Sequence, residues 1–390
     1  MDPHARGGAE GLTASCASHA SFLKIPIARC HSGLNVPPAM QKGHQSGTLE
    51  SGKNPPVTTG WKEIVRKYQQ PSKRMSSWQL VNTLIPYALL WVAMFHAVRI
   101  SWWLVVPLAV LAGAFLIRIF VIFHDCTHGS FFKSKRANEI TGFLTGLLAI
   151  TPFHQWRMEH TVHHSAAGDL DRRGIGDVWT LTVQEYLESS RWKRLSYRFF
   201  RNPVILFGFA PLTLFLVVNR IPVKEANTSV RRWVHITNLC IVAMAVGLSF
   251  VFGTMNYLLM QLMVTSVASI AGVWLFYVQH QFEDVSWERK EDWDFARAAL
   301  SGSSFYKLPK VLQWFSGNIG YHHIHHLSPR IPNYQLERAH ESETMFQQVE
   351  PLTVRGSIKS LNFRLWDEEN RQLTGYKVLK DKRREKAARN

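Results

Sequence analysis

Cysteine is scarce in this sequence. The four cysteines among 390 residues form no CxxC pair and follow no regular spacing. This pattern excludes a disulfide framework and a thiolate zinc finger as the basis of the fold. One of them, Cys240, lies inside an apolar run and is expected to be a small buried residue.

Acidic residues are also few. The chain has 28 Asp and Glu against 45 Lys and Arg, which gives a formal net charge of +17. A basic excess can indicate nucleic-acid binding, but here the basic residues flank long apolar runs. An anionic membrane surface is therefore the expected partner, and nucleic acid is not. The tail KDKRREKAARN fits this interpretation, although an isolated charge run is more often a solvated chain end.

The first 60 residues lack both periodicity and an apolar h-region, and they are rich in Gly, Ser, His and Pro. We expect a disordered N-terminal extension at 1–60 rather than a secretory signal peptide, with Met40 as an alternative start. The remainder is divided into a main domain at 61–350 and a basic C-terminal tail at 351–390.

Long apolar runs dominate the main domain. Four of them, at about 79–98, 102–123, 233–252 and 255–278, are long enough to span a bilayer. They pair into two tight hairpins whose outer ends carry the basic residues, so the positive-inside rule places these ends in the cytoplasm. An all-α integral membrane protein with four transmembrane helices is expected, with a helical cap on the cytoplasmic side.

A fifth apolar run, at 204–218, is ambiguous because it has only about 15 residues and contains Pro211. If it spanned, the histidines before and after it would face opposite sides of the membrane. A re-entrant or interfacial segment is therefore favoured, and the same length consideration makes 140–153 interfacial. Within the second span, Arg118 is expected to snorkel to the interface or to contact a lipid headgroup.

Nine of the 18 histidines, with His323 left aside, gather in four short motifs at the cytoplasmic ends of the spans. HDCTH places two histidines four residues apart, while HTVHH and HHIHH each place three at i, i+3 and i+4. These spacings bring the histidines of each motif onto one face of a helix, and His323 points off that face. The ninth histidine, in YVQH, ends the fourth span.

So many imidazoles indicate a metal centre. Neutral imidazole suits first-row metals including iron, and eight or nine nitrogens are too many for one ion but suit two. The carboxylates near these motifs do not form the ExxH arrangement of soluble di-iron bundles. Nearby carboxylates are better placed to accept a hydrogen bond from the second ring N–H of a ligand histidine. The charged loop GDLDRRGIGD either caps the site or contacts a lipid headgroup or an electron donor. Candidates for supporting roles are Asp125, Asp169, Asn318 (alternatively a helix cap) and His323.

The four motifs together resemble the histidine boxes of the membrane fatty acid desaturases. They read HDCTHGSFF, WRMEHTVHH, YVQHQFED and GNIGYHHIHHLSPRIPNY. The resemblance covers about residues 75–350 and is greatest to the bacterial and plastid-type acyl-lipid desaturases that act at the Δ12 (omega-6) position. It implies a non-haem di-iron centre held by three boxes and one further histidine. The ligands it implies are His124, His128, His160, His163, His164, His280, His322, His325 and His326.

The resemblance also implies a reaction. Desaturation removes two hydrogens from an unactivated CH2–CH2 pair, which no side-chain acid or base can do. Two non-haem iron ions (Fe2+) are therefore implied, with O2 as co-substrate and the acyl chain of a membrane lipid as substrate. No HPGG motif of a cytochrome b5-like domain and no GxGxxG after a strand occurs, so the electrons are expected from a separate ferredoxin or cytochrome.

Two alternatives remain. A related di-iron membrane hydroxylase, acting on a carotenoid or an alkane, would share iron and O2 but would form a hydroxyl group. A non-enzymatic histidine-rich metal-binding protein would need ligands along a path inside the spans, whereas these histidines lie at the cytoplasmic exits. The expected location is the bacterial inner (cytoplasmic) membrane, with the histidine site on its cytoplasmic side.

Overall fold

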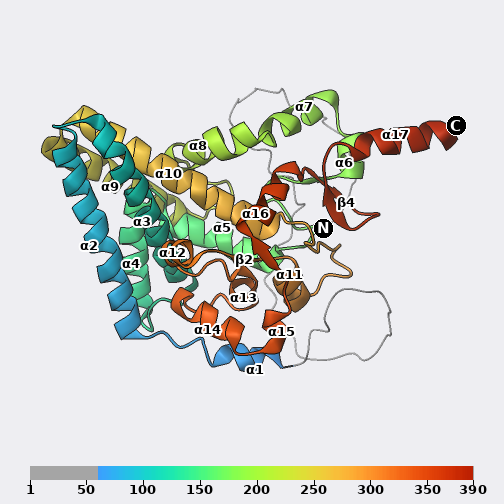
Figure 1. Ribbon diagram of the computed structural model, residues 1–390, viewed down its shortest axis with the longest axis horizontal. Coiled ribbons are helices and arrows are strands. Elements are labelled where there is room, and N and C mark those ends of the chain that lie inside the picture. Colours follow the sequence, from blue (N-terminus) through green and yellow to red (C-terminus); the bar gives the residue numbers. More distant parts are fainter. Residues whose placement is uncertain (1–59, 390) are drawn as a thin grey trace, which may run out of the picture. The chain divides into compact units, whose positions relative to one another are not determined.

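The computed structural model describes residues 60–389, so the expected N-terminal extension lies outside the described residues apart from its last position. Four helices in this range are long and apolar enough to cross a membrane: α2 (Lys73–Ala97), α3 (Trp102–His128), α9 (Thr228–Phe252) and α10 (Thr254–His280). With 25 to 27 residues each, at ~1.5 Å per residue, they exceed a hydrocarbon core of ~30 Å. The prediction of four spanning helices in two hairpins is confirmed (Figure 1).

The spanning helices extend further than the apolar runs that predicted them. α2 begins at Lys73, and the Ser72 side chain caps its first turn by accepting a backbone hydrogen bond. α3 continues to His128 and stops at Gly129, whose φ of 67° is the left-handed conformation that commonly ends a helix. The first histidine motif therefore belongs to the last turns of α3, and His280 is the last residue of α10.

The two hairpins pack against each other through small and apolar side chains. Ala109 and Ala112 of α3 lie in one buried cluster with Met260 of α10. Gly113 permits a close approach of the two helices, because a Cβ at this position would lie 2.6 Å from the side chain of Val267. This contact places the ends of α3 and α10 next to each other.

Short helices form most of the remaining structure. Those before residue 204 are α1 (Trp61–Arg66), α4 (Lys135–Leu148), α5 (Phe153–Ala166), α6 (Val183–Glu188) and α7 (Arg191–Phe200). Those after α10 are α11 (Phe295–Ser301), α12 (Lys310–Phe315), α13 (His322–Leu327), η3 (Asn333–Gln335), α14 (Leu336–Glu341), α15 (Thr344–Gln347), α16 (Val354–Ser357), η4 (Ile358–Asn362) and α17 (Val378–Arg389). Figure 1 shows α5 and α13 in the middle of this region, and α5 packs directly on α3.

The ambiguous segment 204–218 is not one helix. It consists of a π-helical turn (η1, Ile205–Phe209), α8 (Ala210–Leu216) and the start of a 3-10 turn (η2, Val218–Arg220). Joined to α7, it passes the length and composition test for a span only as a helix pair bent by 58°. Such a short, bent segment agrees with the re-entrant or interfacial placement that its length favours.

Five short strands in the described range tie the C-terminal residues to the rest of the domain. β1 (Leu181–Thr182) pairs in parallel with β4 (Leu365–Asp367), which pairs antiparallel with β5 (Gln372–Thr374). β2 (Phe305–Lys307) pairs in parallel with β3 (Pro351–Thr353). The region predicted as a tail, 351–390, thus contains three strands, while the domain boundary at residue 350 stays a prediction.

Candidate metal centre

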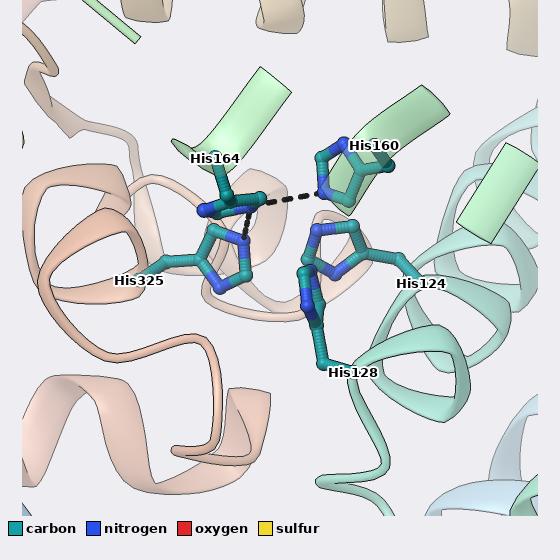
Figure 2. Close-up of side chains that lie close together, drawn as sticks. All are labelled: His124, His128, His160, His164 and His325. Carbon is teal, nitrogen blue, oxygen red and sulfur yellow. Dashed lines mark hydrogen bonds between the residues drawn. The ribbon is translucent and has the colours of Figure 1, made fainter. Parts of the chain in front are cut away.

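Nine histidines from four helices converge on two adjacent groups. The first group contains His124, His128, His160, His164 and His325, whose rings face one another in Figure 2. The second group contains His163, His280, His322 and His326. Within each group, one nitrogen of every ring lies within 4.8 Å of the others. These are the nine histidines that the resemblance implies as ligands, and metal binding by them stays a prediction.

Helical spacing explains how the histidines are divided. In α5, His160 and His164 belong to the first group, and His163 belongs to the second. In α13 the pair at i and i+4 joins the second group, and His325 joins the first. Positions i+3 and i+4 differ by about 100° around a helix, which is enough to aim them at different groups. Each of the two helices therefore serves both groups.

The spacing of the nitrogens fits a shared ion in each group. Nε2 of His164 lies 3.0 Å from Nε2 of His160 and 3.0 Å from Nε2 of His325. Nε2 of His280 lies 3.0 Å from Nε2 of His322. Two nitrogens bound at right angles to one ion, each ~2.1 Å from it, are ~3.0 Å apart.

The rings are also in the right chemical form. Eight of the nine are buried, and only His128 is half-buried. Burial, and then repulsion from neighbouring rings, lowers the pKa of five of these histidines well below its ordinary value: His160, His164, His322, His325 and His326. A neutral ring keeps the lone pair that a metal needs. Among the described residues, Nε2 of His128 and Nε2 of His163 are buried without a hydrogen-bond partner, which fits nitrogens that bind a metal ion.

Asp177 orients one of these histidines. Its Oδ1 lies 2.6 Å from Nδ1 of His163, so an Nδ1–H group donates a hydrogen bond to the carboxylate. The other ring nitrogen, Nε2, then faces the second group. The loop can approach so closely because Gly176 has a φ of 74°, and a Cβ there would lie 3.1 Å from Cβ of His163. Sequence reasoning treated Asp177 only as one of several nearby carboxylates. The glycines near Asp177 in this loop are the sequence feature that could have indicated its close approach to a histidine.

Asp125 joins the first histidine motif to the segment after the third. Its Oδ2 accepts hydrogen bonds from the backbone N–H and the side-chain Nδ2 of Asn333, at 2.7 and 2.8 Å. Asn333 Oδ1 accepts in turn from Nε2 of Gln79 on α2, at 3.0 Å. The other Asp125 oxygen lies 3.5 Å from Nδ1 of His124. Asn318, also a supporting candidate, donates to the backbone oxygen of Asn333 at 3.3 Å rather than to a histidine.

The other two supporting candidates make no hydrogen bond to a histidine of either group among the described residues. Asp169 is buried, and its Oδ2 accepts from Nε of Arg172 at 2.5 Å. His323 is fully buried outside both groups, with its Nε2 3.1 Å from Nδ1 of His340. Asp169 and His323 therefore stabilise the structure around the two groups without contacting their histidines by a hydrogen bond.

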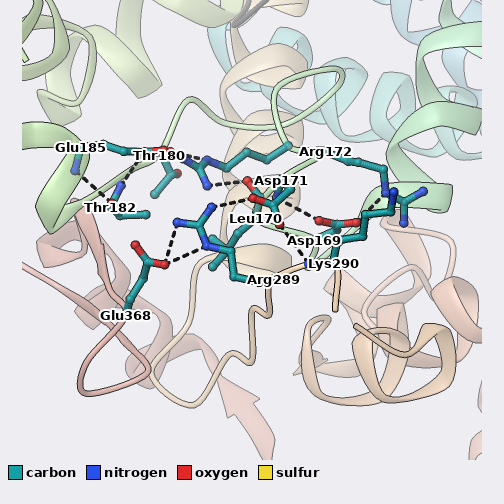
Figure 3. Close-up of polar contacts among 11 residues, drawn as sticks. Asp169, Leu170, Asp171, Arg172, Thr180, Thr182, Glu185, Arg289, Lys290 and Glu368 are labelled. Atoms are coloured by element: carbon teal, nitrogen blue, oxygen red, sulfur yellow. Dashed lines mark hydrogen bonds and ion pairs between the residues drawn. The ribbon is translucent and has the colours of Figure 1, made fainter. Parts of the chain in front are cut away.

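A network of ion pairs anchors the loop that leads to Asp177. Arg289 bridges Asp171 and Glu368, at 2.6 and 2.7 Å. Arg173 pairs with Glu185 at the start of α6. Figure 3 shows these contacts joining the loop to the segment after α10 and to Glu368 beside β4. Of the two interpretations of GDLDRRGIGD, the internal contacts favour a loop that caps the site.

Replacing Asp177 by Asn should weaken metal retention in the second group. The neutral amide accepts the His163 proton less strongly, and loss of such a supporting carboxylate typically lowers metal affinity about 10- to 100-fold. Metal content per chain, measured after dialysis against graded chelator, should fall by one ion before the wild type loses any. Asp292→Asn, in an exposed loop, is the control. Equal retention by D177N and wild type would contradict this role.

Comparison with known proteins gives a consistent result. A family model described as "Fatty acid desaturase" matches residues 101–352. A Bacillus subtilis (strain 168) protein named "Fatty acid desaturase" is 48% identical over 316 residues, which cover 81% of this chain and 90% of that protein. An Arabidopsis thaliana protein, "Omega-6 fatty acid desaturase, chloroplastic", is 30% identical over 260 residues, which cover 62% of this chain and 53% of that protein.

A third relative is from Synechocystis sp. and is named "sn-1 acyl-lipid omega-3 desaturase (ferredoxin)". It is 27% identical over 255 residues, which cover 62% of this chain and 68% of that protein. The family match covers α3, the second hairpin (α9 and α10) and all four histidine motifs. Together with the four spanning helices and the two histidine groups, these similarities show that the chain belongs to the fatty acid desaturase family.

Proposed function

We propose that this chain is an O2-dependent acyl-lipid desaturase that introduces a cis double bond into the acyl chain of a membrane lipid, at the Δ12 (omega-6) position. The observation that carries the proposal is the pair of histidine groups, five and four rings, buried where apolar helices end. The name of the Arabidopsis thaliana relative supports the omega-6 position.

The reaction balances as R–CH2–CH2–R′ + O2 + 2 e⁻ + 2 H⁺ → R–CH=CH–R′ + 2 H2O. Two iron ions, one in each histidine group, would supply the O2 chemistry that removes hydrogen from an unactivated carbon. Nine imidazoles suit iron, and the described residues place no cysteine among them. The chain's own task is to hold these ligands, to position the acyl chain and to keep water out.

Aromatic side chains close the site against water. The Trp156 ring stacks on His160, with centroids 4.1 Å apart, and lies 5.7 Å from His124. On the side of the second group, Phe276 lies 5.4 Å from His163 and 5.1 Å from His280. A dry site protects a reactive oxidant from side reactions, so this shell fits the proposed chemistry.

The electrons are proposed to come from a separate carrier protein, a ferredoxin or a cytochrome. The Synechocystis sp. relative carries "(ferredoxin)" in its name, which supports the first of these. The proposed location is the bacterial cytoplasmic membrane, with the histidine groups on the cytoplasmic side. Basic residues at the outer ends of both hairpins support this orientation.

Expression in a host that makes Δ9-monounsaturated but no Δ12-unsaturated lipids tests the proposal. Gas chromatography with mass spectrometry should reveal a new diunsaturated chain, and derivatisation should place its second double bond at Δ12. A double bond elsewhere would contradict only the position. A hydroxylated chain would instead identify a hydroxylase, and an unchanged profile in cells with a functional carrier would contradict desaturation.

A further inference from the structure

Three segments beside the metal centre carry basic charge only. They are residues 67–76, 131–138 and 328–334, and none contains Asp or Glu. Seven basic side chains on them are exposed, and among the described residues none of the seven forms an ion pair. We call these seven the basic face: Lys67, Lys73, Arg74, Lys133, Lys135, Arg136 and Arg330.

Hydrogen bonds hold the three segments together as one surface. Nε2 of Gln69 donates to Oγ of Ser328 at 2.9 Å. The Ser76 hydroxyl donates to the backbone oxygen of Phe131 at 2.6 Å and lies 3.2 Å from the hydroxyl of Tyr334. Residues far apart in the sequence are therefore neighbours here, and their positive charges add rather than act separately.

The basic face lies next to the most open edge of the metal centre. His128 is the one half-buried histidine of the nine, and Gly129 after it is exposed. Lys133 follows His128 by five residues, a distance of at most ~18 Å even for a fully extended chain. On the third segment, Arg330 follows the second-group residue His326 by four residues. Both histidine groups thus have a short connection to this surface.

We propose that the basic face is the docking surface for an acidic one-electron carrier protein, which reduces the metal centre at the His128 edge. This inference rests on the proposed function. Each docked carrier is oxidised by one electron, so two dockings, with O2 and two protons, accompany each double bond formed. Unpaired exposed charges of one sign steer an oppositely charged protein into a productive orientation.

An anionic lipid surface is the competing occupant of a basic patch. Lys73 and Arg74 open α2 and could lie near lipid headgroups. Lys133, Lys135 and Arg136 instead follow the second span, and Arg330 follows the third histidine motif, each within a few residues of a candidate ligand histidine. Lipid binding requires no proximity to a ligand histidine, whereas electron transfer does, so the position of the patch favours the carrier.

A charge-reversal triple variant tests the proposal. Lys133→Glu, Lys135→Glu and Arg136→Glu change the charge of one segment by six, and acidic residues in the first turn of α4 suit the helix dipole. The matched control is Lys377→Glu, Lys380→Glu and Arg384→Glu, near or on α17 and exposed. The purified protein in detergent is mixed with a purified acidic ferredoxin, and carbodiimide cross-linking and the KM for ferredoxin are measured at low and high salt.

The first triple variant should lose about tenfold in cross-linking yield and gain about tenfold in KM for ferredoxin, while the control matches the wild type. Salt should weaken the wild-type association steeply and the variant's only slightly. Single-turnover product with dithionite as reductant should be unchanged in both. Cross-linking and KM equal to wild type would overturn the proposal. So would unchanged cross-linking with activity lost only in anionic vesicles, which would assign the patch to lipid.

The two proposals fail in different ways. If wild-type protein makes no unsaturated product even with dithionite, the proposed function is contradicted. The cross-linking comparison needs no turnover, so it still decides whether the basic face binds an acidic carrier.

Discussion

Replacing His325 by Ala should abolish product formation and lower the metal content of the protein. Its Nε2 lies 3.0 Å from Nε2 of His164, and its ring centroid is 4.4 Å from that of His124, so it completes the first group between two helices. Loss of a direct ligand should cost more than the ~10- to 100-fold in affinity that is typical of a supporting residue. Gas chromatography measures the product, and elemental analysis measures iron per chain.

The matched control for H325A lies on the same helix. His323→Gln replaces a buried ring outside both groups with an amide that can still hydrogen-bond to His340. H323Q should keep both ions and most of the activity. Among the histidines of this motif, His323 is therefore the one whose replacement should affect the protein least. Metal and activity retained in H325A would remove His325 from the ligand set. Wild-type protein with one iron per chain, or with zinc and full activity, would contradict a di-iron centre.

Replacing Arg201 by Ala should cause the largest loss of stability. Arg201 is fully buried, and its NH2 group donates to Tyr277, to Gln281 and to the backbone oxygen of Phe363, at 3.2, 3.1 and 3.0 Å. These contacts join the end of α7, the end of α10 and the C-terminal segment. Alanine opens a buried cavity and leaves Oε1 of Gln281 without its arginine donor, which should cost about 3–5 kcal/mol. Thermal unfolding in detergent measures the loss.

Two further variants complete the Arg201 test. Arg201→Lys should also unfold at a lower temperature, because one ammonium group cannot reproduce the fork of a guanidinium. Arg191→Ala, at an exposed position of the same helix, should change stability by less than about 0.5 kcal/mol. An R201A protein that melts with the wild type would show that these contacts contribute little. Because Gln281 follows His280 directly, R201A should also release metal from the second group more readily.

The spans and the histidine motifs could be predicted because they are local patterns. A run of apolar residues and an i, i+3, i+4 spacing are each read within one helix. The same local view put the three histidines of HTVHH on one face, but it did not show that they are shared between two groups. That division depends on where α3, α10 and α13 end in space, since His163 finds its partners on other helices.

The supporting contacts could not be predicted because they join distant parts of the chain. Arg118 was expected to snorkel or to contact a headgroup. Instead it is buried, donates to Thr83 at 3.1 Å and to the backbone oxygen of Trp314, and lies 3.9 Å from that ring. Likewise, the three-residue strands β3 and β4 have no periodicity to detect, and their distant parallel partners β2 and β1 define them.

The pairing of β1 with β4 has a consequence for biosynthesis. Residues 181–182 follow the loop that carries Asp177, but their partner strand is residues 365–367, close to the end of the chain. A growing polypeptide emerges in sequence order, so all four spanning helices are synthesised before this strand exists. The histidines of α5 are therefore translated early and receive their final surroundings last. We therefore expect metal loading with full affinity to follow the synthesis and pairing of β4.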